Sequence, residues 1–179
     1  MPFVFLVLGA VVLDSVARSR THAFSMLQAR HALHRVAQAL GVRAPELRDL
    51  PGAANAFATA NGAVLVDVAW LEAHLRRACG DGRCRESVLV FLMGHELAHV
   101  ILGHGFVPMP GRTMSMELDA DHVAGVAMGR LGVDPRAAIE VLAGLMQHAC
   151  WPTHGCPDQR AMAIWKGYGR GLCEGRLAA

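Results

Sequence analysis

The chain has 179 residues, of which 53% are hydrophobic and 18% charged, a composition that fits one folded domain and excludes a disordered chain. The formal net charge of +2 and the absence of a basic run argue against a nucleic-acid-binding protein. We expect one domain over residues 25–179, preceded by a separate apolar segment, residues 1–24.

The apolar segment has three interpretations. Residues 2–13 are too short for a transmembrane helix, which needs about 20 apolar residues. They fit the apolar part of an export signal, with residues 15–17 as a small-x-small cleavage pattern, although no Lys or Arg precedes them. They also fit a membrane-associating anchor or a plain packed helix. Export or membrane association is favoured over a cytoplasmic location.

The first regular element of the domain is a helix over residues 25–40. Leu33, Val36 and Leu40 recur at helical spacing, and Gly41 provides a stop. Residues 45–51 then form a connector with room for a short strand.

A β-hairpin is predicted next. Asn61-Gly62 is typical of a two-residue hairpin turn between β-prone segments. In that register Phe57 lies opposite Val66, and Thr59 lies opposite Val64.

Four helices follow the hairpin. We expect them over residues 70–79, 86–102, 116–131 and 134–147, each ending near a glycine or beginning near a capping residue. The order of helix, hairpin and four helices predicts an α+β domain that is mostly helical and has one small antiparallel sheet.

The cysteines are spaced for two short disulfides. Cys79 and Cys84 bracket one short loop, Cys150 and Cys156 bracket another, and Cys173 is left over. Two disulfides suit an oxidising compartment, whereas the alternative is five reduced thiols in the cytosol. The lack of a CxxC spacing argues against a zinc site built from cysteines.

The stretch HELAH, residues 95–99, carries the chemistry. His95 and His99 are four residues apart on a predicted helix, so both imidazoles face the same side, as one zinc ion requires. Glu96 is rotated away by about one residue step and can hold a water molecule. His104 would lie about 140° around the helix from His99 if the helix continued past Gly103, and we interpret it as a C-terminal cation or a surface residue.

The third zinc ligand is sought in ELDAD, residues 117–121. Glu117 and Asp121 are four residues apart on the next predicted helix, so both can face the same site. Glu117 would bind the metal, and Asp121 would fix the tautomer of a ligand histidine. The alternative is a solvated helix N-terminus with favourable acidic residues.

HELAH followed by ELDAD resembles the gluzincin zinc peptidases, specifically the HtpX-like and CAAX-prenyl-endopeptidase-like family. Residues 55–72 resemble the family's hairpin that begins Asn-Ala-Phe, and residues 153–164 resemble its Thr-His-Pro stretch, which an arginine and a helix follow. The resemblance covers about residues 28–168 and implies a zincin-like minimal endopeptidase domain with one Zn²⁺ per chain. By position it implies that His95, His99 and Glu117 are the ligands, that Glu96 is the general base and that Asp121 orients a histidine.

The resemblance also implies how a peptide substrate binds. Asn55 and His154 match positions lining the family's cleft, where they contact the substrate or stabilise the oxyanion. The strand at residues 64–67 is the edge to which a substrate peptide adds as an extra strand. We interpret Arg160, which matches the family's arginine, as a structural ion-pair partner rather than a catalytic group. Two residues separate His154 from Pro157, where the family has His-Pro; a reduced Cys156 could therefore bind the zinc as a thiolate, as an alternative to a disulfide.

Two rival functions remain open. One is an ImmA/IrrE-like regulatory peptidase, although members of that group typically have asparagine where this chain has Asp121. The other is a non-catalytic, zinc-stabilised binding or chaperone-like module.

Overall fold

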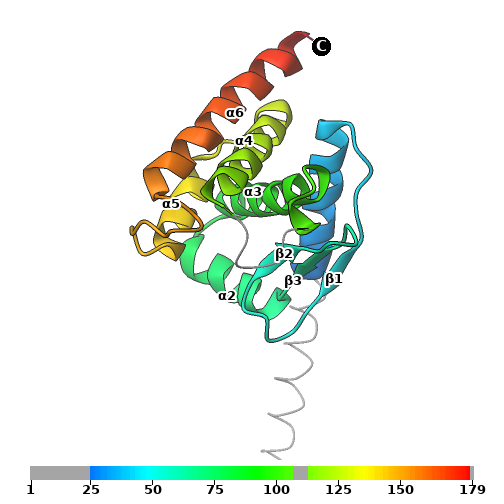
Figure 1. The fold of residues 1–179 in the computed structure, drawn as a ribbon, viewed down its shortest axis with the longest axis vertical. Coiled ribbons are helices and arrows are strands. Elements are labelled where there is room, and N and C mark those ends of the chain that lie inside the picture. The colour runs from blue at the N-terminus through cyan, green and yellow to red at the C-terminus, as the bar shows by residue number, and fades with distance from the viewer. Residues whose placement is uncertain (1–24, 107–112, 178–179) are drawn as a thin grey trace, which may run out of the picture.

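The computed structural model describes residues 25–106 and 113–177. Helix α3 runs through the middle of the fold, with the sheet and helix 25–40 on one side and α4 and α6 on the other (Figure 1). The expected α+β, mostly helical class is confirmed. The elements are helix 25–40, β1 Leu47–Asp49, β2 Ala56–Ala58, β3 Val64–Val66, α2 Val68–Ala78, α3 Gly82–Ile101, the 3₁₀ turn η1 His104–Phe106, α4 Met114–Leu131, α5 Arg136–Leu145 and α6 Pro157–Leu177.

The sheet has three strands in the order β1-β3-β2, with β1 parallel and β2 antiparallel to β3. The prediction that residues 64–67 form a free edge is therefore wrong, because β3 is paired on both sides. The short connector strand β1 fills the side of β3 that the sequence analysis left open. Of the two outer strands, β2 contributes residues to the lining of a cleft of about 730 Å³.

The hairpin register differs by one residue from the prediction. Phe57 lies opposite Leu65 rather than Val66, and Ala58 takes the place opposite Val64. The cause is a longer loop: Thr59 N–H donates to the Ala63 carbonyl (2.9 Å), which leaves three residues in the turn. Gly62 has φ +79°, as expected for a three-residue loop that ends in a left-handed residue.

Helices α2 and α3 begin earlier than predicted because aspartates cap them. The carboxylate of Asp67 accepts from Trp70 N–H (3.0 Å), and that of Asp81 accepts from Cys84 N–H (2.8 Å). Each cap satisfies backbone donors that the first helical turn cannot satisfy internally. The first turn of α3 therefore precedes Glu86, the predicted start.

Helix α6 is absent from the order of elements predicted from the residues, although the family resemblance implied a helix after residues 153–160. Its sequence contains four glycines between residues 167 and 175, which disfavour an isolated helix. Packing against α4 explains it: a Cβ at Gly167 would stand 2.0 Å from the His122 carbonyl oxygen, and one at Gly125 would stand 2.2 Å from the Ile164 carbonyl oxygen. Glycine on both helices lets the two backbones touch.

Both predicted disulfides are present, Cys79–Cys84 and Cys150–Cys156, and Cys173 is a free, exposed thiol. The alternative of a zinc-binding Cys156 thiolate is thereby overturned. The predictions for residues 1–24 lie outside the described residues. Among the helices that the structure describes, none combines the length and apolar character needed to cross a membrane.

Candidate metal centre and cleft

Helix α3 carries His95 and His99 on one buried face. Their exposed fractions are 7% and 0%, and their Nε2 atoms lie 3.1 Å apart. The preceding Gly94 allows α4 to approach, because a Cβ there would stand 3.2 Å from the Cα of Ala124. The close approach brings the first turns of α4 beside the two imidazoles.

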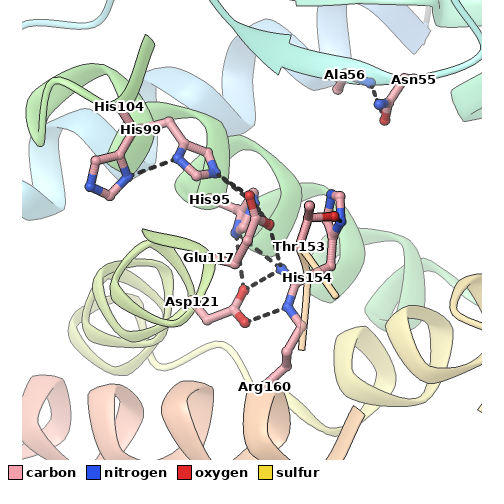
Figure 2. A network of polar contacts seen from close by, with 10 residues as sticks. All are labelled: Asn55, Ala56, His95, His99, His104, Glu117, Asp121, Thr153, His154 and Arg160. Atoms are coloured by element: carbon pink, nitrogen blue, oxygen red, sulfur yellow. Dashed lines mark hydrogen bonds and ion pairs between the residues drawn. The ribbon is translucent and has the colours of Figure 1, made fainter. Parts of the chain in front are cut away.

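Glu117, in the first turn of α4, completes a cluster of three ligand atoms. Its carboxylate oxygens lie 3.4 Å from His95 Nε2 and 3.5 Å from His99 Nε2 (Figure 2). Ligand atoms around a tetrahedral zinc with bonds of about 2.0–2.1 Å stand about 3.3 Å apart. The donor set of two imidazoles and one carboxylate therefore fits zinc in both chemistry and spacing. It is also the only such cluster of His, Cys, Asp and Glu among the residues described.

Asp121 lies one helical turn beyond Glu117 and joins two partners. Its Oδ1 lies 3.0 Å from His95 Nδ1, and Arg160 of α6 binds it through Nε (2.6 Å) and a terminal nitrogen (2.7 Å). Both Asp121 and Arg160 are buried. The structure thus brings Asp121 to a predicted ligand histidine and pairs Arg160 with a buried carboxylate, as the resemblance implied.

The charges of the cluster favour a bound cation. Burial alone would lower the pKa of His95, but its hydrogen bonds to Asp121 and Glu117 outweigh burial and raise the pKa to about 9. Burial alone would raise the pKa of Glu117, but His95 and Arg160 lower it to about 2. Both shifts show that the carboxylates around His95 stabilise positive charge at this site. A bound divalent ion would supply that charge in place of a proton on His95.

His104 is buried next to His99, a position that the sequence analysis did not predict. It is 8% exposed, and its Nδ1 lies 2.9 Å from Nδ1 of His99, so the prediction of a surface residue is wrong. The angle of 140° assumed a continuing helix, whereas α3 ends at Ile101 with Leu102 as its C-cap, and Gly103 is left-handed with φ +74°. The Gly-His pair at the end of the ligand helix was the signal that could have identified it.

A cleft of about 730 Å³ opens beside the metal cluster. Glu96, which is 4% exposed, lies on its lining with His95 and Glu117. Most of the remaining lining is apolar and comes from β2, α2, α3, α5 and the segment after α5, including Phe57, Trp70, Leu75, Val88, Phe91, Leu92, Leu142, Leu145, Met146 and Trp151. The geometry combines one charged end with a long apolar wall.

Asn55 and His154 both line this cleft but do not join the metal cluster. The Nδ1 of His154 bonds the Thr153 hydroxyl (2.7 Å), while the Asn55 Oδ1 accepts from Ala56 N–H (2.9 Å) on β2 (Figure 2). The buried Asp67 fixes the loop before Asn55 by accepting from the N–H groups of residues 52 and 54. Both predicted cleft positions are therefore held in place by local hydrogen bonds.

Comparison with known proteins gives one result. A sequence model of peptidase family M48 matches residues 26–115, about half of the chain, and this range includes all of α3. Glu117, Asp121 and Arg160 lie beyond it. Neither the comparison with curated proteins nor that with solved structures returned a match.

Proposed function

The chain belongs to peptidase family M48, and from this premise we propose that it is a zinc-dependent endopeptidase whose ligands are His95, His99 and Glu117. The observation that carries the proposal is the buried cluster of two imidazoles and one carboxylate at the charged end of an apolar cleft, in which the two Nε2 atoms lie 3.1 Å apart and each has a Glu117 oxygen at 3.4 or 3.5 Å. The ELDAD spacing on α4 further supports the HtpX-like and CAAX-prenyl-endopeptidase-like branch.

The reaction needs a Lewis acid and a base. Bound zinc would lower the pKa of a water molecule and polarise the scissile carbonyl. Glu96, on the cleft lining next to His95, takes the proton as the water attacks and delivers it to the departing amine. Asp121 and Arg160 hold His95 in the tautomer that leaves Nε2 free to bind metal.

The substrate peptide binds along β2 rather than β3. Asn55 uses its carbonyl to accept from Asp67 N–H (2.9 Å) on the β3 side. Because antiparallel strands alternate, the backbone of Ala56 faces the free edge, where its N–H currently bonds the Asn55 side chain. An added strand would exchange this local bond for one to the substrate and release the Asn55 amide to contact it. His154 would contact the same substrate from the other wall.

The apolar wall indicates the side chains that the cleft accepts. Apart from the metal cluster, Glu96 and Arg160, the described residues that line the cleft include no charged carboxylate or ammonium group. We therefore expect extended protein segments with large uncharged apolar residues near the scissile bond to be cleaved in preference to acidic ones.

The test compares Glu117→Ala with Asp119→Ala. Both residues are acidic and lie on α4, but Glu117 is 3% exposed and Asp119 is exposed. We expect one zinc per chain by elemental analysis in the wild type and in Asp119→Ala, with casein cleavage intact. Glu117→Ala should lose both zinc and cleavage; full zinc occupancy in that variant would refute the ligand assignment.

Glu96→Gln separates an enzyme from a non-catalytic module. The variant should keep its zinc, because Glu96 is not a ligand, and lose about 10²- to 10⁴-fold in kcat. A biological effect that survives this loss in full would instead favour the binding module. Cleavage of a transcriptional repressor in preference to extended apolar segments would favour the ImmA/IrrE-like alternative.

A further inference from the structure

His104 contacts the proposed ligand His99 on the side of its ring that faces away from the metal cluster. Its ring is buried, its Nδ1 lies 2.9 Å from His99 Nδ1, and the two ring centres are 5.1 Å apart (Figure 2). The Nε2 of His99 faces the opposite way, toward His95 and Glu117. His104 therefore touches the one ring nitrogen of His99 that does not face the metal cluster.

The backbone fixes His104 in this place. Gly103, with φ +74°, follows the C-cap of α3 and turns the chain out of the helix, and His104 begins the 3₁₀ turn η1. The next residue, Gly105, lies directly against the hairpin, since a Cβ there would stand 2.5 Å from the Thr59 carbonyl oxygen. A glycine before and a glycine after His104 thus hold its ring against His99.

Only one arrangement of protons lets His99 bind a metal through Nε2. A neutral imidazole carries its proton on one nitrogen, so a free Nε2 lone pair requires the proton on Nδ1. That Nδ1–H must then donate to Nδ1 of His104, which in turn carries its own proton on Nε2. The reverse arrangement would protonate Nε2 of His99 and block it.

We propose that His104 is a positioning residue that accepts a hydrogen bond from His99 Nδ1–H and so selects the metal-binding tautomer of His99. It does for His99 what Asp121 does for His95, with a neutral acceptor in place of a carboxylate. The inference rests on the proposed function, because it assigns a role to His104 through a ligand.

The test measures zinc affinity of the full chain by competition with a chelating dye. His104→Leu removes the acceptor at similar volume and should weaken zinc binding by about 10- to 100-fold, whereas His104→Gln keeps an acceptor and should stay within about threefold of the wild type. His34→Leu and His34→Gln, at an exposed position of helix 25–40, are the matched controls and should leave zinc affinity unchanged.

The outcomes separate this inference from the proposed function. Tight zinc binding by His104→Leu would overturn the role of His104 and leave the ligand set intact. Equal losses in His104→Leu and His104→Gln would show that ring shape rather than an acceptor matters, which also overturns it. A wild type without zinc would refute the proposed function and the inference with it.

A second measurement does not depend on the variants folding. Nitrogen NMR of the zinc-bound wild type reports which ring nitrogen of each histidine carries a proton. We expect His99 protonated on Nδ1 and His104 on Nε2. A proton on Nδ1 of His104 would overturn the proposal.

Discussion

The α4–α6 interface and the apolar wall of the cleft are built in opposite ways. In the interface, glycines on each helix touch the backbone of the other: added Cβ atoms at residues 125, 129, 167 and 171 would stand 2.0 to 2.3 Å from carbonyl oxygens. In the wall, α5 buries only Ala138, and Leu145 and Trp151 are 38% and 43% exposed. Backbone contact therefore fixes the distance between the helices that carry Glu117, Asp121 and Arg160, whereas the proposed substrate would meet side chains, of which Leu145 and Trp151 are partly exposed.

The strongest test of the interface is Arg160→Leu. The substitution leaves Asp121 buried without its bidentate partner, and breaking a buried ion pair costs about 3–5 kcal/mol. Chemical denaturation of the metal-free protein measures the loss in free energy of unfolding. Arg160→Lys keeps the charge but not the two-point contact with Asp121, so its free energy of unfolding should lie between those of the wild type and Arg160→Leu. A loss below about 1 kcal/mol would mean that the pair does not stabilise the interface.

The next largest effect is expected from a glycine pair on α6. Gly167→Ala should destabilise the protein by about 1–3 kcal/mol, because its methyl group would meet the His122 carbonyl oxygen. Gly169→Ala, two residues along the same helix, meets nothing within 4 Å and should stabilise by up to about 1 kcal/mol. Thermal unfolding of both variants measures the contrast. Equal shifts of the same sign would contradict the backbone contact.

The smallest effect is expected from the wall, and it concerns substrate binding. Trp151→Ala should raise KM for apolar peptides about tenfold, which corresponds to about 1.4 kcal/mol of binding free energy. Trp165 on α6 is equally exposed but does not line the cleft, so Trp165→Ala is the control and should leave KM unchanged. An unchanged KM in Trp151→Ala would remove the wall from substrate binding.

The sequence predicted those parts of the site that depend on spacing within one helix. His95 with His99, and Glu117 with Asp121, are four residues apart, so each pair shares a face whatever the rest of the chain does. The disulfides, whose cysteines lie five and six positions apart, are local in the same sense.

The rest depends on contacts between distant segments or on a change of backbone direction. Whether β3 is an edge depends on a three-residue strand, β1, whose own sequence carries little signal. Helix α6 forms despite its four glycines, because the close contact with α4 leaves no room for a Cβ at Gly167 or Gly171. The prediction for His104 was wrong because it assumed a continuing helix, whereas Gly103 is left-handed. The predicted hairpin register was wrong because the turn contains three residues rather than two.

The three proposed ligands come from two helices, so zinc binding would also affect how long the protein survives in the cell. Zinc held by His95, His99 and Glu117 would cross-link α3 to α4 in the folded state only. Free zinc at a thousand times its dissociation constant would then add about 4 kcal/mol to the free energy of unfolding, a large part of the stability of a typical domain. A cell short of zinc would therefore hold less of this protein, because the metal-free chain would unfold more often and be degraded sooner.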